Sequence, residues 1–477
     1  MRQNRAMSPA ANDFSPAALR AVLDGPGVAA GGGAAGARWC VALSGGLDST
    51  VLLEAMGRLR DQLPAGGLRA VHVHHGLHAD ADAWARSCET RCARLGVPLT
   101  VLRVDARPGR GESPEARARE LRYAALAAEL LPGEILLTAH HADDQLETVL
   151  IQLLRGAGVA GLAAMPADAS FGPGRHCRPL LGFTRVALRA WAAAERLPGW
   201  VEDPANEALR FARNHLRSEV LPAVRAHWPA AASAVSRSAR HCAEAAGLLD
   251  ELAAMDAAAC ADGDTLVVSG LRRLSPGRCR NLVRWQARRL GLAVPDERRL
   301  ATLVEQVLDA APDTHPEIHW AGVVALRHAD RLWMVPEACL PPPLEELAWP
   351  EPREPLALGP GLGTLELVSS DSGGLSAAAL AAAPWRVVGR HGGERLRLPG
   401  REGSRALKKL LQAAGFPPWV RARIPLLEID GQLAAAGPRW IDRSWWAPSG
   451  DAAWRLRWRD CRLPGGEDLI VGERTFC

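Results

Sequence analysis

The residues best suited to chemistry form the string SGGLDST at positions 44–50 of the 477-residue chain. The string follows a short apolar run and precedes residues with helical periodicity, which is typical of a loop between a strand and a helix. Glycines let the backbone approach an anion closely, and the first N–H groups of a helix have no partners within it. We therefore expect the loop to bind phosphate. The residues that would contact it are Ser44, Gly45, Gly46, Leu47, Asp48 and Ser49.

This loop lacks the lysine of a Walker motif, which would reach the β- and γ-phosphates of a nucleotide. The absence excludes a P-loop kinase or GTPase. A lysine-free loop that grips the terminal phosphates favours attack at the α-phosphate with release of pyrophosphate, and Asp48 is placed to bind Mg²⁺ there. The alternative interpretation is a simple strand-to-helix turn that Asp48 caps.

Acidic residues follow another predicted strand in HHADDQLET, at positions 140–148. Asp144 and Glu147 are three residues apart, so they share one face of a helix that starts here. Carboxylates on such a face suit a metal ion or a cationic substrate. The alternative is a helix N-terminus that negative charge stabilises.

Histidines gather at the ends of the same predicted strands. His74 and His75 would face opposite sides of a strand, and no cysteine or third ligand comes at zinc spacing, so we do not expect a zinc site. We expect His75 and His140 to line the nucleotide pocket. The histidines in question are His72, His74, His75, His140 and His141.

The elements that position these motifs alternate between strand and helix. Apolar runs predict strands at 38–43, 68–74, 98–104 and 135–139, and helical periodicity predicts helices at 49–60, 80–95 and 114–131. Such alternation is typical of an α/β fold with a doubly wound parallel sheet, which binds ligands at the carboxyl ends of its strands. The motifs above all follow strand ends.

The length predicts more than one domain. We interpret 1–36 as a disordered leader, 37–225 as the catalytic domain, and 226–340 as a helical middle domain with helices near 230–259, 277–290 and 297–310. A Pro- and Glu-rich region at 341–383 reads as a linker. A small basic α+β domain at 384–450 follows, and the tail at 451–477 shows no usable pattern.

Composition narrows the class of protein. The net charge is only +4, and no apolar run is long enough to span a membrane. The ten cysteines contain no C-x-x-C pair, which favours reduced thiols in a cytoplasmic protein. Basic residues are nearly all arginine, so the lysine pair at 408–409 and the single tyrosine, Tyr123, are informative exceptions.

Local clusters of positive charge indicate contact with nucleic acid. Arg119 and Arg122 lie on one predicted helix and could grip phosphate of ATP or RNA by forked hydrogen bonds. In the basic domain we expect cations to bind the RNA backbone, with Trp419 stacking on an exposed base. A solvated basic surface is the alternative for each. The cations of this domain are Arg395, Arg397, Lys408, Lys409, Arg421 and Arg423.

SGGLDS resembles the pyrophosphate-binding signature of the N-type ATP pyrophosphatases. In chain order it is joined by HVHHGL (72–77), PEARARELRY (114–123), TAHHADDQLETVLIQLLRGAGVAGLAAM (138–165), RPLL (178–181) and WVEDPANEALRFARNHLR (200–217). Together these strings closely resemble the tRNA(Ile)-lysidine synthase family. The strings GGERLRLPG (392–400) and LKKLLQAAGFPPWVRARIPLL (407–427) resemble the C-terminal tRNA-binding domain of that family more weakly.

The resemblance implies a specific reaction. The family uses ATP to adenylate C2 of the wobble cytidine, position 34, in the isoleucine tRNA with a CAU anticodon, and free lysine then displaces AMP. It implies ATP and Mg²⁺, with Asp48 and Asp144 holding the metal and Asp144 and Glu147 binding lysine. Asp48, Asp144, Glu147 and Arg122 would be catalytic, and Arg119 would join the basic domain in binding tRNA. The oligomeric state stays open, a homodimer included.

Three other interpretations compete with this one. A tRNA thiolase of the same superfamily, such as a 2-thiocytidine synthetase, would need a C-x-x-C pair, which is missing. A small-molecule amidating enzyme, such as NAD or GMP synthetase, would not need the basic domain. A non-catalytic tRNA-binding protein would not need intact SGGLDS and HHADDQLET strings.

One further stretch suits a pocket wall and a Pro-capped turn equally well. Its polar residues are Glu202, Asp203, Asn206, Arg213 and Asn214.

Overall fold

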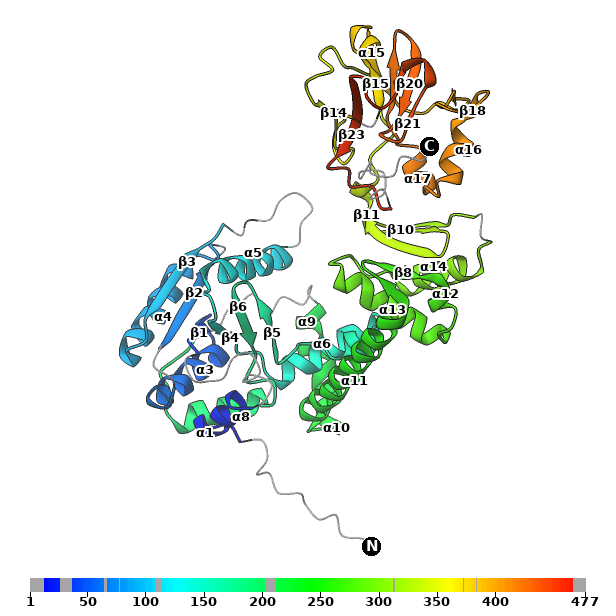
Figure 1. The fold of residues 1–477 in the computed structure, drawn as a ribbon. Coiled ribbons are helices and arrows are strands. Elements are labelled where there is room, and N and C mark those ends of the chain that lie inside the picture. The colour runs from blue at the N-terminus through cyan, green and yellow to red at the C-terminus, as the bar shows by residue number, and fades with distance from the viewer. Residues whose placement is uncertain are drawn as a thin grey trace. The chain divides into compact units, whose positions relative to one another are not determined.

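The computed structural model describes residues 13–25, 37–63, 67–76, 78–105, 107, 114–201, 212–311, 314–371, 373–382 and 384–465. The chain forms two compact units, Met1–Leu248 and Leu249–Cys477 (Figure 1). No helix in these described ranges is both long and apolar enough to cross a membrane.

The first unit is built on a six-stranded sheet with the order β3-β2-β1-β4-β6-β5. All neighbouring strands are parallel except β5, which runs antiparallel to β6 at one edge. The predicted doubly wound parallel sheet is confirmed. The strands are β1 (Trp39–Ala42), β2 (Leu68–His74), β3 (Leu99–Arg103), β4 (Ile135–Leu137), β5 (Asp168–Phe171) and β6 (Gly174–Cys177).

Helices cover both faces of this sheet, because its strands alternate buried side chains between the two faces. Trp39 and Val41 of β1 pack in a core with α3, α4 and α8, whereas Cys40 packs on the opposite face with Leu126 of α5. The bounds of these helices are α3 (Leu47–Arg58), α4 (Ala81–Leu95), α5 (Pro114–Glu129) and α8 (Arg185–Ala194).

The prediction of a disordered leader at 1–36 is wrong for residues 13–25. Helix α1 (Pro16–Leu23) begins after Ser15, whose side chain accepts a hydrogen bond from the Ala18 N–H. Leu19 and Leu23, four residues apart on one helix face, are fully buried in the core of the sheet domain. Ala-rich composition hid this short apolar stripe. Residues 1–12 and 26–36 lie outside the described residues.

The topology creates a ligand site at the carboxyl ends of β1 and β4. From β1 the chain moves through β2 to β3 on one side, and it later returns to place β4 on the other side of β1. Open α/β sheets bind ligands at such a switch point. The loop after β1 leads into α3, and the loop after β4 leads into α6 (Ala142–Leu154).

Helices after β6 support α6. Leu146 of α6 packs with Leu221 of α10 and with Ala232 at the start of α11. A π-helical turn, η3, interrupts the path into α10, and such turns are rare and often found at functional sites. The elements are α7 (Val159–Leu162), α9 (Ala212–His215), η3 (Leu216–Val220), α10 (Leu221–His227) and α11 (Ala231–Cys260).

The second unit begins with the domain that we predicted to be helical, and the structure adds a sheet to the predicted helices. Helices near the predicted positions are present, but they pack on an antiparallel sheet with the order β7-β8-β11-β10-β9. Strands β7 and β8 are too short to show an alternating pattern, and β10 and β11 are too continuously apolar, whereas β9 alternates over only four residues, EIHW. The elements are α12 (Val268–Leu271), α13 (Pro276–Arg289), α14 (Glu297–Asp309), β7 (Ala261–Asp262), β8 (Thr265–Val267), β9 (Glu317–Trp320), β10 (Val323–His328) and β11 (Arg331–Pro336).

The C-terminal domain is larger than predicted, because the described residues of the supposed linker (341–371 and 373–382) and of the supposed tail (451–465) belong to it. Strand β14 (Thr364–Ser370) of the supposed linker pairs along its whole length with β23 (Ala453–Arg459) of the supposed tail. Leu365 and Trp458 are partners in this ladder and both are buried. The apolar residues of β23 alternate with Arg455, Arg457 and Arg459, a strand signal that we overlooked.

This α+β domain contains short helices, two five-stranded sheets with the orders β12-β16-β19-β20-β21 and β13-β14-β23-β15-β22, and a two-stranded sheet of β17 and β18. The remaining elements are β12 (Leu347–Ala348), β13 (Leu356–Ala357), β15 (Gly374–Ser376), α15 (Ala377–Ala381), β16 (Trp385–Val388), β17 (Arg395–Leu396), β18 (Arg405–Ala406), α16 (Leu407–Ala413), α17 (Pro418–Arg421), β19 (Leu426–Ile429), β20 (Gln432–Ala436), β21 (Trp440–Ile441) and β22 (Trp446–Ala447).

Candidate active site

The loop between β1 and α3 is held by its own serines. The Ser44 N–H donates to Ser49 Oγ over 3.2 Å, and Ser49 Oγ donates to the Gly46 carbonyl over 3.1 Å. The two hydroxyl oxygens are 2.9 Å apart. Helix α3 starts after Gly46 without a side-chain cap, so its first N–H groups remain available to an anion.

Gly45 adopts a conformation that other residues rarely reach, with φ at +86°. A Cβ atom at this position would lie 3.2 Å from Cys88 Sγ and 3.5 Å from Val201 Cγ2. The Gly45 carbonyl also accepts a hydrogen bond from the Val201 N–H. Backbone conformation and tight packing therefore both require glycine in the loop.

Asp48, in the first turn of α3, meets the start of α6. His141 Nε2 lies 3.6 Å from Asp48 Oδ2 and 3.5 Å from Asp144 Oδ2, so the imidazole brings both carboxylates together. Burial alone would raise the pKa of Asp48, but His141, Arg185 and Arg217 lower it below its usual range. Asp48 is therefore ionised, and its buried Oδ1 has no hydrogen-bond partner within the described residues.

Asp144 and Glu147 share one partner, Arg217, as their spacing on one helix face predicts. The Arg217 guanidinium donates to both carboxylate oxygens of Glu147, at 2.5 and 2.9 Å, and to Asp144 Oδ1 at 3.0 Å. Burial raises the pKa of Glu147 above its usual range, although Arg217 opposes that shift. Arg217 lies in the π-helical turn η3, which aims it at α6.

Comparisons with known proteins agree along most of the chain. Residues 28–224 match the family model of the PP-loop domain, 266–333 match the TilS substrate binding domain, and 385–458 match the TilS substrate C-terminal domain. A tRNA(Ile)-lysidine synthase from Methylococcus capsulatus is 44% identical over 85% of this chain and 92% of that protein. Two further proteins of the same name match similarly. The one from Pseudomonas aeruginosa is 44% identical over 88% of this chain and 93% of that protein. The one from Alkalilimnicola ehrlichii is 45% identical over 83% of this chain and 88% of that protein.

The chain belongs to the tRNA(Ile)-lysidine synthase family. Its two substrate-domain matches carry the specific name of the family, and the PP-loop match covers the sheet domain that holds the site. This membership decides against the thiolase and NAD or GMP synthetase interpretations. It also identifies the chain as an enzyme, because its relatives are named as synthases.

The site of this family member fits the Mg²⁺ that the resemblance implies. Asp48 and Asp144 offer hard oxygen ligands, and the buried Asp48 Oδ1 lacks a hydrogen-bond donor among the described residues. Among the residues that the structure describes, no set of three or more His, Cys, Asp and Glu side chains could hold a metal alone. Two carboxylates plus substrate phosphates are the ligand set that Mg²⁺ commonly uses.

The remaining acid of the string, Asp143, has a structural position. Its Oδ2 accepts a hydrogen bond from the Arg185 N–H at the start of α8, and its Oδ1 accepts one from Arg225 of α10. Asp143 therefore ties α6 to two neighbouring helices. The arginines that contact these acids were not predicted from the sequence. They are Arg185, Arg217 and Arg225. Arg217 ends the string at 200–217, which was the available signal.

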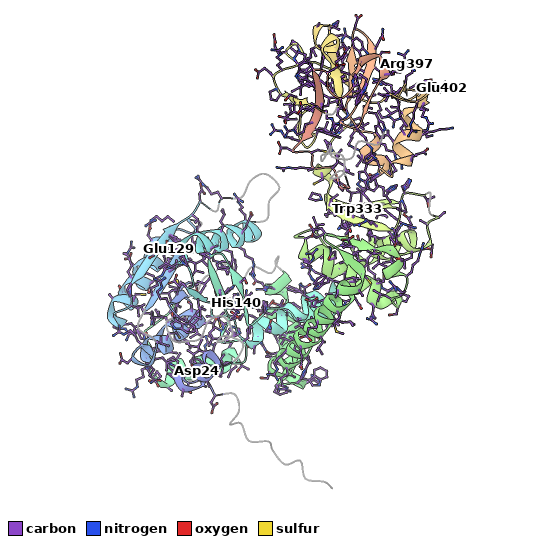
Figure 2. All side chains as sticks on the ribbon, in the orientation of Figure 1. Asp24, Glu129, His140, Trp333, Arg397 and Glu402 are labelled. Atoms are coloured by element: carbon purple, nitrogen blue, oxygen red, sulfur yellow. The ribbon has the colours of Figure 1, made fainter. Side chains whose placement is uncertain are left out.

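The histidines divide between the sheet and the site. His72 Nδ1 lies 2.8 Å from the Leu43 carbonyl, and His74 pairs with Asp82, which fits structural roles. His75 directly follows β2, and His140 comes three residues after the end of β4, at the edge that carries the phosphate loop (Figure 2 labels His140). Burial lowers the pKa of His140 to about 3, so its imidazole is neutral.

The arginines of α5 surround the single tyrosine of the chain. The guanidinium carbons of Arg119 and Arg122 lie 5.2 and 5.7 Å from the centroid of the Tyr123 ring. Tyr123 in turn contacts His176 of β6, with ring centroids 5.8 Å apart. Of the predicted pocket wall, Arg213 donates to Thr148 at 3.0 Å and Asn214 is buried. Glu202, Asp203 and Asn206 lie outside the described residues.

In the C-terminal domain the predicted cations fall into two groups. Arg421 and Arg423 are half-buried and donate to backbone carbonyls, so they stabilise the fold. Trp419 is also buried and donates its indole N–H to the Pro464 carbonyl, so the prediction that it stacks on an RNA base is wrong. The exposed cations are Arg395, Arg397, Lys408 and Lys409 (Arg397 is labelled in Figure 2).

Proposed function

We propose that this chain ligates free L-lysine to C2 of the wobble cytidine, position 34, in the tRNA(Ile) with a CAU anticodon, with ATP as co-substrate. The similarity to tRNA(Ile)-lysidine synthases over 83–88% of the chain carries this proposal, because it includes both substrate domains. The products would be lysidine in the tRNA, AMP and pyrophosphate. The proposed location is the cytoplasm.

In the first step the cytidine O2 attacks the α-phosphorus of ATP, and the bond to pyrophosphate breaks. Ser44 to Ser49 and the free N–H groups of α3 would bind the triphosphate, since they form an uncapped helix N-terminus behind a glycine-rich loop. Asp48 and Asp144 would hold Mg²⁺, which supplies positive charge to the triphosphate. Arg122, on α5, would add a guanidinium for the same phosphates.

In the second step a lysine amine attacks C2, and the bond between C2 and the oxygen of AMP breaks. The amine is an ammonium ion in water, so it must lose a proton before it attacks. Asp144 and Glu147 would bind the ammonium, and Glu147 is the better proton acceptor because burial raises its pKa. Arg217 contacts both carboxylates, so the lysine ammonium must share them with Arg217 or displace it.

The tRNA backbone would contact Arg119 and the exposed cations of the C-terminal domain, Arg395, Arg397, Lys408 and Lys409. Their side chains are exposed, as salt-dependent phosphate contacts require. Arg421 and Arg423 are no longer part of the proposed tRNA surface, because they are half-buried as well as bound to backbone carbonyls of the domain itself.

The test is to incubate the purified full-length chain with ATP, Mg²⁺, radiolabelled lysine and a tRNA transcript with a CAU anticodon. We expect label in tRNA, and none in a matched transcript with uridine at position 34. AMP formation without lysine in the tRNA, supported by another acceptor, would refute the proposal.

A further inference from the structure

A chain of hydrogen bonds runs from β6 to the end of β4 and ends at His140. Arg178 Nη2 lies 3.1 Å from His176 Nδ1, and His176 Nε2 lies 2.8 Å from Thr138 Oγ1. Thr138 Oγ1 is in turn 2.9 Å from His140 Nδ1. The Thr138 N–H donates to the Cys177 carbonyl, which holds together the ends of β4 and β6, the strands next to these side chains.

The direction of every bond in this chain follows from Arg178. A guanidinium can only donate, so His176 Nδ1 must accept and the proton of neutral His176 must be on Nε2. Nε2–H then donates to Thr138 Oγ1. Among the described residues His140 Nδ1 is the only other hydrogen-bond partner of this hydroxyl, so the hydroxyl donates its single proton to His140 Nδ1. His140 therefore carries its own proton on Nε2.

Both imidazoles are neutral, as this assignment needs. Burial is the largest cause that lowers the pKa of His140 and of His176 to about 3, and Arg178 lowers both further. Arg178 is anchored independently, because its Nη1 donates to the Pro166 carbonyl at 2.8 Å. Its guanidinium is therefore held in place without help from the histidines.

We propose that Arg178, His176 and Thr138 are positioning residues that fix His140 as a hydrogen-bond donor to an oxygen of a nucleotide substrate. No described residue accepts a hydrogen bond from His140 Nε2, so this donor is left for a ligand. The inference rests on the proposed function, because that function puts a nucleotide in the phosphate loop, at the same sheet edge as His140. The acceptor is an oxygen of ATP or of the tRNA cytidine. His140 is thus a donor and not a general base.

The tautomer can be measured without any substrate. Nitrogen-15 spectra of the histidine-labelled full-length chain separate protonated from unprotonated ring nitrogens, and His140→Gln identifies the signals of His140. We expect a proton on Nε2 in the wild-type chain. Thr138→Val, of nearly equal shape, should release the ring into a mixture of tautomers, whereas Thr138→Ser should restore the wild-type pattern. His176→Phe, which keeps the contact with Tyr123, should act like Thr138→Val.

Kinetics then identifies the acceptor. If His140 donates to ATP, Thr138→Val should weaken ATP binding in the absence of tRNA by about threefold to tenfold, the range of one hydrogen bond. If it donates to the cytidine, ATP binding stays unchanged and single-turnover pyrophosphate release with tRNA slows by a similar factor. Thr100→Val on β3 is the matched control, because the Thr100 hydroxyl has no hydrogen-bond partner among the described residues.

Three results would overturn the proposal. These are a proton on Nδ1 of His140 in the wild-type chain, an unchanged tautomer in Thr138→Val, and an altered tautomer with ATP binding and pyrophosphate release both unchanged. A wild-type chain that transfers no lysine would refute the proposed function instead. The spectra would still report the tautomer in that case, so the two failures are distinguishable.

Discussion

At the scale of single residues, the acids near the start of α6 have equal charge but different partners. Asp143 contacts the backbone of α8 and Arg225, whereas Asp48 and Asp144 meet at His141, and Glu147 binds Arg217. Sequence spacing correctly placed Asp144 and Glu147 on one face. It could not separate Asp143 from them, because that distinction depends on arginines 42 and 82 residues away.

Glu147→Gln tests the separation of the two chemical steps. The amide keeps the shape of the side chain but cannot accept the ammonium proton, so lysine transfer should slow by about a hundredfold. Single-turnover pyrophosphate release should stay within about threefold of wild type. The two rates are measured by quenched-flow with labelled ATP and labelled lysine. Equal losses in both steps would show that Glu147 does not act on lysine.

Asp48→Asn tests the proposed Mg²⁺ ligand. The neutral amide should reduce pyrophosphate release by at least about a hundredfold, the order of loss when a charge-stabilising group is removed from an active site. Binding of tRNA in a filter assay should stay near normal. Asp82→Asn, at an exposed position in the first turn of α4, is the matched control. Persistent turnover in Asp48→Asn would contradict the metal assignment.

At the scale of elements, the strand-loop-helix unit of β1 and α3 was the most predictable part of the fold. Its apolar run, glycines and helical period all indicate the same structure, and the structure agrees. Helix α1 was missed because only Phe14, Leu19 and Leu23 distinguish it within an Ala-rich segment. The partners of β14 could not be predicted either, since β23 lies about 90 residues further along the chain.

Gly45→Ala tests the geometry of the loop. Alanine must adopt a positive φ and contact Cys88 and Val201, so ATP binding should weaken by about tenfold or more. Gly133→Ala is the matched control, because Gly133 has a similar φ of +74° and nothing within 4 Å of the added Cβ. That variant should lose about 1 kcal/mol of stability and no ATP affinity. Equal loss of ATP affinity in both variants would refute the loop assignment.

The ion pair between β2 and β4 predicts how stability depends on pH. Burial would raise the pKa of Glu134, but hydrogen bonds from Arg69 and the Leu131 N–H lower it below its ordinary value of 4.5. A lowered pKa in the folded state contributes stability above the unfolded pKa, and this contribution is lost as the pH falls through the folded pKa. The opening free energy of β2 and β4 amides should therefore fall as the pH drops below 4.5, the ordinary pKa of the carboxyl.

Glu134→Gln should cost about 3 kcal/mol at pH 7, because it leaves Arg69 without its buried partner, and it should flatten this dependence on pH. Native-state hydrogen exchange measures the opening free energy at each pH. Glu120→Gln, on the exposed side of α5, is the control. An equally steep dependence in Glu134→Gln would assign the acid sensitivity to other carboxylates.

At the scale of the whole molecule, the chain combines one catalytic sheet domain with two substrate domains. The sequence predicted the order of these parts. The prediction of a linker and a tail was wrong, because short strands with distant partners leave little local signal in the sequence. Positive charge was predictable only as a total. The sequence alone does not distinguish exposed residues of this domain from Trp419, Arg421 and Arg423. Only the tertiary structure shows that these three side chains donate to backbone carbonyls and stabilise the fold.

The salt dependence of tRNA binding tests the exposed lysine pair. Lys408→Ala with Lys409→Ala should weaken binding and reduce the slope of log K against log salt by about 1.5, as expected for two lost phosphate contacts. Arg288→Ala with Arg289→Ala is the control in the same unit, because those guanidiniums already pair with Asp250 and Asp264. An unchanged slope in the lysine variant would place the tRNA elsewhere.

The most direct test of the proposed reaction is the stoichiometry of products formed by the wild-type chain on tRNA with a CAU anticodon. AMP, pyrophosphate and tRNA-bound lysine are quantified together in one time course. Equimolar amounts of all three, with lysine recovered on the nucleoside at position 34, are the result that the account predicts. AMP and pyrophosphate without lysine on that nucleoside would contradict it.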